Sequence, residues 1–315
     1  MPRAVIIMSG GDAASPFTTP EVACSSGLAA GNTDTALREY LLARGHAVYT
    51  APAMNGRGVV ADPDPTSFGA FGGQPEVLGE QFTVNSDGDI DLAGEHLARF
   101  VELLHDRYGI DEVDFIGHSN GGLFARSAIR TMGLLGVPVR TRSLITLGSP
   151  WMGSMPLRWA YGEIPDAALM GQEFALKLAA GSKARIAEGD LGLAQENTYH
   201  YLVGARRWNE FQIGILDEIP VFTIGGTYFQ AQGGDPELWP NDGLVTAYSA
   251  VAAGLPSAVA PRHKSANFPV THSIFISNLI GAPWETGMTW NPDVLAAVAA
   301  FLDDPSGQVT TQGMS

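Results

Sequence analysis

The fold of this chain is decided by the stretch Asp114-Phe115-Ile116-Gly117-His118-Ser119-Asn120-Gly121-Gly122-Leu123. It begins as an apolar strand, passes through Gly-x-Ser-x-Gly, and continues into residues 123–130, which contain no helix breaker. A strand, a tight turn and a helix in this order are typical of a nucleophile elbow, in which the serine stands out of the turn in strained backbone geometry. Gly117 and Gly121 are expected where any side chain would collide with the neighbouring strand or helix.

Two interpretations of this turn are open at the level of sequence. In the first, Ser119 is a nucleophile, and the helix behind it points its first backbone N–H groups and its positive end at the reacting carbon. In the second, the turn is an ordinary glycine-rich connection and Ser119 is incidental. The apolar strand before the turn and the uninterrupted helix after it favour the first interpretation.

Apolar strands alternate with amphipathic helices on both sides of the elbow. Strands are predicted at 4–8, 47–51, 113–116, 143–147, 220–225 and 266–270, and helices before Gly45, before Gly109, and at 123–130, 274–280 and 294–302. This order predicts an α/β fold, with a mostly parallel central sheet, right-handed crossovers and helices on both faces. The segment 52–89 is predicted to be a long irregular loop.

The regular alternation stops between residues 151 and 219. We therefore divide the chain into a core formed by 1–150 and 220–303, a helical insertion at 151–219 and a flexible tail at 304–315. The insertion contains a predicted helix at 166–180 and a group of large apolar side chains. This group comprises Trp151, Met152, Met155, Leu157, Trp159 and Tyr161.

The composition excludes several classes of protein. With 315 residues and 45% hydrophobic content, the chain can bury the core of one large domain. Its net charge of −15 disfavours binding to nucleic acid or to anionic membrane surfaces, and no segment is apolar enough for stable membrane insertion. Cys24 is the sole cysteine and no signal peptide is recognisable, so we expect a cytoplasmic protein, with a mature secreted domain as the alternative. The sequence predicts no oligomeric state.

A nucleophilic serine needs a base within hydrogen-bond reach and a third group that orients the base. His272 follows the last predicted strand and precedes a helix, whereas His263 is expected in an exposed turn between two basic residues, so His272 is favoured as the base. For the acid, Asp242 is favoured because it lies in a turn one strand-loop unit after the strand at 220–225, and Asp235 is the alternative.

Two backbone N–H groups are needed to stabilise the negative oxygen that forms when a serine attacks a carbonyl group. One is expected from Asn120, directly after the nucleophile. The other is expected from the loop after the first strand, at Gly11 or at the neighbouring Asp12, with Gly11 favoured.

Four segments together resemble the bacterial triacylglycerol lipases and related esterases of the α/β-hydrolase superfamily. They are residues 117–122 (Gly-His-Ser-Asn-Gly-Gly), 148–154 (Gly-Ser-Pro-Trp-Met-Gly-Ser), 241–245 (Asn-Asp-Gly-Leu-Val) and His272. The resemblance implies an α/β-hydrolase fold with a catalytic triad of Ser119, Asp242 and His272, and an oxyanion hole to which the loop after the first strand contributes. It covers most of the sheet framework but not the segment 52–89 or the details of the insertion.

The sequence departs from this family in two places that bear on chemistry. Ser9-Gly10 stands where the family usually has His-Gly, and the acidic calcium ligands that often follow the catalytic histidine are replaced by Ser273-Ile274-Phe275-Ile276. We therefore expect no metal site and no cofactor.

The activity expected from these residues is serine carboxylic-ester hydrolysis of a small-molecule ester or lipid. We expect the insertion to cover the site as a cap, with Met152, Met155 and Trp159 lining the acyl pocket, while a small satellite core is the alternative role of these side chains. An acyltransferase or thioesterase with the same triad is the nearest alternative function, and a non-catalytic binding protein on the same scaffold is a more distant one.

Overall fold

The computed structural model describes residues 2–22, 33–60, 75–169, 173–188, 195–231 and 234–306. Cys24 and most of the predicted tail lie outside these ranges. Within them, no helix combines the length and the apolar character that crossing a bilayer requires.

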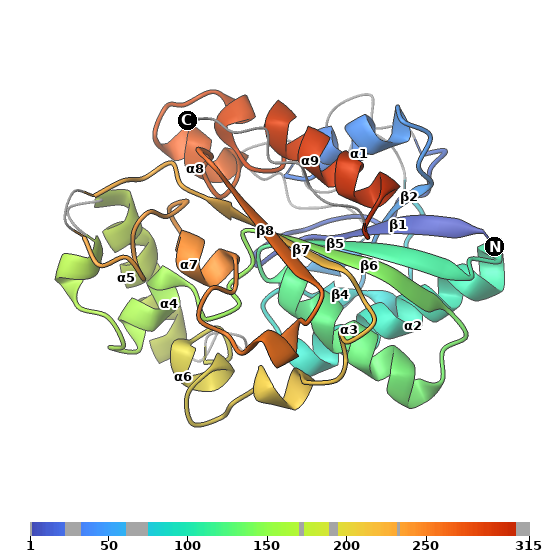
Figure 1. Ribbon diagram of the computed structural model, residues 1–315, viewed down its shortest axis with the longest axis horizontal. Helices are drawn as coiled ribbons and strands as arrows, with labels where there is room; N and C mark the ends of the chain where they lie inside the picture. The colour runs from blue at the N-terminus through green and yellow to red at the C-terminus, as the bar shows by residue number, and fades with distance from the viewer. Residues whose placement is uncertain are drawn as a thin grey trace.

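A six-stranded parallel sheet forms the centre of the molecule (Figure 1). Its strands, in spatial order, are β2 (Val48–Thr50), β1 (Arg3–Met8), β5 (Glu112–His118), β6 (Arg140–Leu147), β7 (Val221–Gly226) and β8 (His263–Phe268). Each neighbouring pair is parallel, and Ile6 lies opposite Phe115 in the register of β1 with β5. The prediction of a parallel sheet is confirmed.

Helices cover both faces of the sheet, as predicted. In Figure 1, α2 (Ile90–Tyr108) and α3 (Gly121–Leu135) lie below the sheet, and α1 (Thr35–Leu42) and α9 (Pro292–Asp303) lie above it. Since successive side chains of a strand point to opposite faces, each central strand contributes to two cores. Ile6 and Phe115 belong to the core beneath α2 and α3, whereas Ile7 and Ile116 belong to the core beneath α1 and α9.

Helix α2 shows how local sequence sets an element's ends. The Asp89 side chain accepts hydrogen bonds from the backbone N–H groups of Asp91 and Leu92, which have no partner within the helix. At the other end, Gly109 adopts a φ of +65°, the left-handed conformation that glycine tolerates best. The helix that leads into β5 is therefore fixed at both ends by local sequence, and its predicted end before Gly109 is confirmed.

Three sequence-based expectations about secondary structure were wrong in part. The segment 52–89 contains a small second sheet, in which β3 (Ala53–Met54) pairs in parallel with β4 (Val84–Asn85), and η2 (Glu80–Phe82) lies just before β4 in the chain. The last strand begins earlier than predicted, so His263 lies in β8 rather than in an exposed turn. The helix expected at 166–180 is present from Glu173 as α5 (Glu173–Ala187), whereas residues 166–169 form the separate 3₁₀ helix η3 (Asp166–Leu169).

The insertion (residues 151–219) lies beside the carboxyl ends of the strands, at the lower left of Figure 1. Besides η3 and α5 it contains α4 (Met155–Ala160), α6 (Tyr199–Leu202) and η4 (Glu210–Gln212). The remaining short elements follow β7 and β8. They are α7 (Ala247–Ala250), η5 (Ser257–Val259), α8 (Ile274–Leu279) and η6 (Trp284–Thr286).

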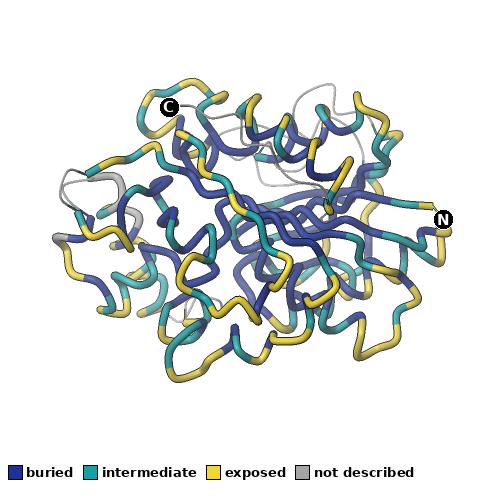
Figure 2. Tube along the Cα trace, in the orientation of Figure 1, coloured by how far each residue is buried: buried dark blue, intermediate teal, exposed yellow. Residues whose placement is uncertain are grey.

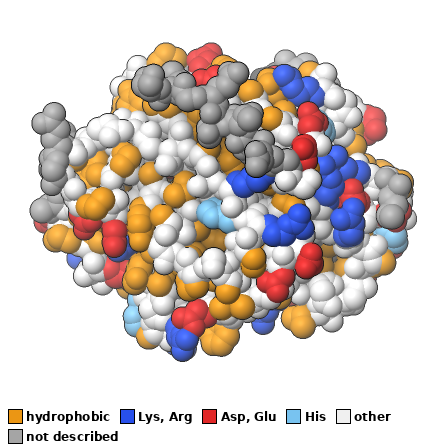
Figure 3. Space-filling view, viewed as in Figure 1, with side chains coloured by type: hydrophobic (Ala, Val, Ile, Leu, Met, Phe, Trp, Pro, Cys, Tyr) orange, Lys and Arg blue, Asp and Glu red, His pale blue; other side chains and the backbone are white. Residues whose placement is uncertain are grey.

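Burial and charge are distributed unevenly over the molecule. Figure 2 shows that the central strands are buried along their length, whereas β8, at the edge of the sheet, alternates between partly buried and exposed residues. In Figure 3 the basic side chains gather on the right-hand half of the face, over the amino-terminal ends of the strands. On the left-hand half of the same face, hydrophobic and other uncharged side chains predominate between scattered acidic and basic ones.

Candidate active site

Ser119 occupies the sharp turn between β5 and α3, and its backbone is strained. Its φ is +54°, a left-handed conformation that costs a non-glycine residue about 1–2 kcal/mol. A side chain at Gly117 would place its Cβ 2.4 Å from the Gly122 nitrogen, and one at Gly121 would place its Cβ 2.1 Å from the Met8 carbonyl oxygen. The glycines of the motif therefore allow strand, turn and helix to approach closely enough to expose the serine.

His272 lies in the loop between β8 and α8 and is held at several atoms. Its Nδ1–H donates to Asp242 Oδ2 at 2.7 Å, and its backbone N–H donates to the Asp242 carbonyl oxygen at 2.8 Å. The ring is buried, with 3% of the residue exposed. Because the proton on Nδ1 is engaged by Asp242, Nε2 keeps its lone pair and can accept a proton.

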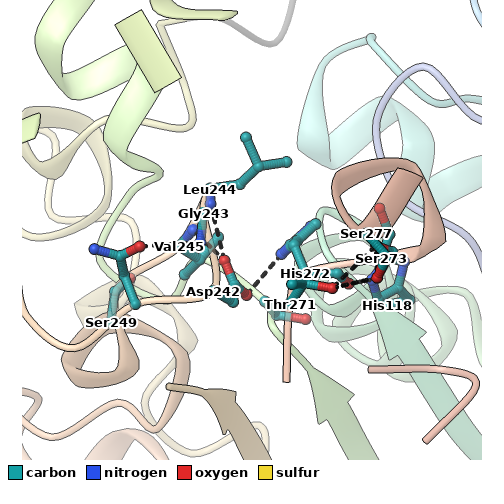
Figure 4. A network of polar contacts seen from close by, with 12 residues as sticks. His118, Asp242, Gly243, Leu244, Val245, Ser249, Thr271, His272, Ser273 and Ser277 are labelled. Carbon is teal, nitrogen blue, oxygen red and sulfur yellow. Dashed lines mark hydrogen bonds and ion pairs between the residues drawn. The ribbon is translucent and has the colours of Figure 1, made fainter. Parts of the chain in front are cut away.

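Asp242 follows β7 in a turn that surrounds its carboxylate with donors (Figure 4). Oδ1 accepts the backbone N–H groups of Leu244 at 2.9 Å and Val245 at 2.7 Å, and Oδ2 accepts His272 Nδ1–H. The residue is fully buried. Three hydrogen bonds replace the water that burial removes, so this turn can hold a carboxylate against the imidazole ring.

His118, which directly precedes the serine, supports His272 from behind. Its Nε2–H donates to the His272 carbonyl oxygen at 2.8 Å, and the two ring centroids are 4.9 Å apart. Burial, followed by the nearby His272, lowers the pKa of His118 to about 3. His118 therefore stays neutral and adds no positive charge against an imidazolium at His272. Sequence reasoning missed this residue, although its position next to the serine was the available signal.

His118 connects the Ser119 turn to His272, but Ser119 itself is not hydrogen-bonded to the His272 ring. Among the described residues, no hydrogen bond within 3.5 Å joins Ser119 Oγ to the His272 ring. Gly148, which follows β6, lies beside the imidazole, since a Cβ there would be 3.1 Å from His272 Nδ1. Catalytic hydrogen bonds are often loose in a free enzyme and shorten when substrate binds.

The loop after β1 approaches Ser119 closely. A Cβ on Gly10 would lie 2.4 Å from Ser119 Cβ, and a Cβ on Gly11 would lie 2.8 Å from Asn120 Nδ2. The Asp12 backbone N–H donates to Asp87 Oδ1 at 3.0 Å, so it is not available to a ligand. Within the described ranges, the N–H groups of Gly11 and Asn120 have no acceptor, which leaves both available as oxyanion donors.

The Asn120 side chain is held by a residue of the insertion. Asn197 Nδ2–H donates to Asn120 Oδ1 at 2.8 Å, and both residues are buried. Asn197 lies 77 residues from Asn120 in the chain and carries no motif, so the sequence offered no signal for it.

The predicted substrate-binding side chains do not form one cluster. Met152 packs in the main core beneath α2 and α3, and its backbone N–H donates to Ser249 Oγ at 3.0 Å. Met155 packs with partly buried Trp159 in a third apolar cluster, which also contains Trp239 from the loop before Asp242. Their proposed role in substrate binding remains a prediction.

The two alternative residues lie elsewhere. His263 Nε2 shares a hydrogen bond of 2.8 Å with Thr223 Oγ1 on the neighbouring strand, and burial lowers its pKa. Asp235 Oδ1 accepts the backbone N–H of Glu237 within its own turn. In the described ranges, no hydrogen bond joins either residue to His272 or Ser119. Across the described part of the chain, no group of three or more His, Cys, Asp or Glu could hold a metal ion.

Comparisons with known proteins agree with this geometry. The family model described as "Putative serine esterase (DUF676)" matches residues 76–173, which include the elbow. A Bacillus licheniformis lipase in its mature form superposes with a TM-score of 0.53 at 14% identity, covering 95% of this chain and 90% of the lipase. A gene product of Listeria innocua gives a TM-score of 0.50 at 15% identity, covering 96% and 95% of the two chains.

The chain has the α/β-hydrolase fold. This confirms the fold expected from the resemblance to bacterial lipases and esterases. In this fold the Ser119 turn, the Asp242 turn and the His272 loop follow β5, β7 and β8, at the carboxyl edge of the sheet where open α/β sheets bind ligands. No curated protein sequence matches this one.

Proposed function

We propose that this protein is a serine carboxylic-ester hydrolase that acts through an acyl-enzyme on Ser119. The observation that carries the proposal is the buried His272, which Asp242 holds in the tautomer of a base while His118 ties it to the strained serine turn. A strained serine turn and a buried imidazole–carboxylate pair both reduce stability, and such features are typically found where a serine is activated.

In the proposed reaction, His272 Nε2 accepts the Ser119 hydroxyl proton as Oγ attacks the ester carbonyl carbon. The electron pair of the carbonyl bond moves to its oxygen, and the N–H groups of Gly11 and Asn120 stabilise the resulting negative charge. Collapse of this intermediate breaks the bond to the alcohol, which leaves with the proton from His272. Water then attacks the acyl-enzyme by the same route, which releases the acid and restores Ser119.

Asp242 has two functions in this scheme. It keeps the Nδ1 proton in place, and its negative charge stabilises the imidazolium that forms when Nε2 is protonated. His118 remains neutral throughout, because a pKa of about 3 lies far below the working range of such an enzyme. All of these roles are filled by side chains and backbone groups of this chain.

Two further findings support a hydrolase of the lipase or esterase kind. The matching family is described as a serine esterase family, and the Bacillus licheniformis protein of similar fold is named as a lipase. The apolar side chains of the insertion, Met152, Met155 and Trp159 among them, suit an acyl chain, so we propose small-molecule esters or lipids as substrates.

A fluorophosphonate probe tests the proposal directly, because it forms a covalent bond only with an activated serine. We expect stoichiometric labelling of the parent protein at Ser119, mapped by peptide mass spectrometry, and no labelling of Ser119→Ala. Hydrolysis of p-nitrophenyl esters, measured with and without an added alcohol or thiol acceptor, then shows whether water resolves the acyl-enzyme. An unlabelled parent protein with a normal melting temperature would disprove the proposed function.

A further inference from the structure

The loop after β1 (residues 9–13), called the oxyanion loop below, contains a second strained residue, Asp12, next to the proposed donor Gly11. The Ala13 N–H donates to the Gly10 carbonyl oxygen at 3.3 Å, which closes a four-residue turn over residues 10–13. Asp12 has a φ of +55° at the third position of this turn, where glycine or asparagine is usual. The same Gly10 carbonyl belongs to the peptide unit that carries the Gly11 N–H, so the turn sets the direction of that donor.

Asp87, which follows β4, holds this turn from the side. Its Oδ1 accepts the Asp12 N–H at 3.0 Å, and a Cβ on Gly11 would be 3.4 Å from the same oxygen. The neighbouring Ser86 Oγ–H donates to the Ala13 carbonyl oxygen at 3.1 Å. The segment after β4 is therefore hydrogen-bonded to this turn at Asp12 and at Ala13.

Arg185, near the carboxyl end of α5 in the insertion, bridges both carboxylates. Its Nη1 lies 3.0 and 3.1 Å from the two carboxylate oxygens of Asp12, and its Nη2 lies 3.2 Å from Asp87 Oδ2. The Asp87 side chain is only 8% exposed, whereas that of Arg185 is 30% exposed. Burial, and then the charge of Asp12, raise the pKa of Asp87 to about 6, and Arg185 opposes this rise.

We propose that Asp87 is a positioning residue for the oxyanion hole and that Arg185 couples the insertion to it. The inference rests on the proposed ester hydrolysis. Two carboxylates beside a developing negative oxygen would oppose its formation, and the guanidinium compensates them through direct contact. The insertion therefore helps to keep the oxyanion loop in its working conformation, in addition to any contact with substrate.

The test separates the oxyanion hole from substrate binding and from stability. Four variants are compared with the parent: Asp87→Ala, Asp87→Asn, Arg185→Gln, and the double variant Asp87→Asn with Arg185→Gln. Arg99→Gln serves as the matched control, because Arg99 pairs with Glu95 on the surface of α2. The measurements are kcat and KM for an acetate ester, the inhibition constant of a trifluoromethyl ketone that forms a tetrahedral adduct with serine, and the melting temperature.

Asp87→Ala removes the acceptor for the Asp12 N–H. We expect kcat and the affinity for the trifluoromethyl ketone to fall together, by about 10- to 100-fold, with KM within about threefold of the parent. Asp87→Asn keeps an acceptor oxygen and should lose less than Asp87→Ala. A lower melting temperature with unchanged kcat and ketone affinity would show that Asp87 has only a structural role and would overturn the inference.

Arg185→Gln leaves the charges of Asp12 and Asp87 uncompensated. We expect a loss of about 3- to 10-fold in ketone affinity, and partial recovery in the double variant because Asp87→Asn removes one of the repelling charges. Additive losses in the double variant would refute the coupling by Arg185. If the parent protein failed to react with a fluorophosphonate, the proposed function itself would fall, whereas normal parent reactivity with unaffected variants would refute only this inference.

Discussion

Replacing Asp242 by asparagine should abolish catalysis while leaving the fold intact, because the surrounding hydrogen bonds dictate how the amide must lie. Asp242 Oδ1 accepts two backbone N–H groups, from Leu244 and Val245. An asparagine at this position must place its oxygen there, since its NH2 group cannot accept either bond. The NH2 group then faces His272 Nδ1, which must offer a lone pair and carry its proton on Nε2 instead.

This tautomer cannot take a proton from Ser119, so the expected loss in kcat is about 10³- to 10⁴-fold. At about 1.4 kcal/mol per tenfold, the transition state loses about 4–5.5 kcal/mol. Asp242→Ala should behave differently, because it leaves two buried N–H groups without an acceptor. At about 1–3 kcal/mol for each group, this variant should lose about 2–6 kcal/mol of unfolding free energy.

The assay pairs steady-state hydrolysis of p-nitrophenyl acetate with urea unfolding for the parent, Asp242→Asn and Asp242→Ala. The reasoning predicts a nearly inactive asparagine variant with close to parental stability and an alanine variant that is both inactive and destabilised. An Asp242→Asn protein that kept more than about a tenth of the parental kcat would refute the reasoning, since a wrong tautomer cannot be that active.

Four further outcomes are expected. His272→Ala should lose about four orders of magnitude in kcat whereas His263→Ala stays within a few-fold, and a reversal measured in the same ester assay would transfer the role of base to His263. EDTA should change neither activity nor melting temperature, and a loss reversed by calcium would contradict this expectation. Met155→Ala should lower kcat/KM for long-chain esters and leave kcat/KM for acetate esters nearly unchanged. An equal loss at every chain length, together with a lower melting temperature, would assign Met155 to the satellite core alone. Burial raises the pKa of Asp34 from 3.8 to about 7, so folding favours its protonated form. As pH rises from about 4 to 7, the parent should therefore lose up to about 4 kcal/mol of unfolding free energy relative to Asp34→Asn. Urea unfolding of both proteins across this pH range measures the difference, and an unchanged difference would contradict the prediction.

The sheet and the elbow could be predicted because short-range sequence determines them. Val113, Phe115 and Ile116 are apolar and lead into Gly117, and residues 123–130 contain no helix breaker, so strand, turn and helix follow from local preference. The order of strands and helices then restricts the topology to a parallel sheet. Once this is given, loops that follow β5, β7 and β8 must meet at one edge, which is why residues far apart in sequence could be named together.

The last strand was misplaced because it lies at the edge of the sheet. Residues 263–268 read His-Lys-Ser-Ala-Asn-Phe, a polar run that resembles a loop. An edge strand has only one neighbour and keeps much of its surface in water, so polar side chains such as Lys264 are tolerated and even expected there. Strands that are buried on both faces are recognised by a continuous apolar run, and an edge strand of this kind has none.

The supporting residues of the site lay beyond sequence reasoning for a different reason. Asp87 contacts Asp12 across 75 positions in the chain, and Arg185 contacts Asp12 across 173. Neither lies in a motif, and charged residues in an acidic protein are usually solvated. Their roles depend on which loops the fold brings together, so only the three-dimensional contacts reveal them.

The two strained residues of the site, Ser119 and Asp12, are held in place by different parts of the fold. Ser119 and Asp12 both adopt left-handed backbone conformations, and Gly10, two residues before Asp12, is in contact range of Ser119. Such conformations persist only where the surroundings over-determine them. At Ser119 the constraint comes from β5, α3 and the close approach of β1, all parts of the buried sheet. At Asp12 it comes from Asp87 and Arg185, which are polar contacts to a short loop and to the insertion. Ser119 is therefore held by buried strands and a buried helix, whereas the loop at Asp12 is held by polar contacts that water and pH can weaken, so we expect activity to fail at the loop before it fails at the serine.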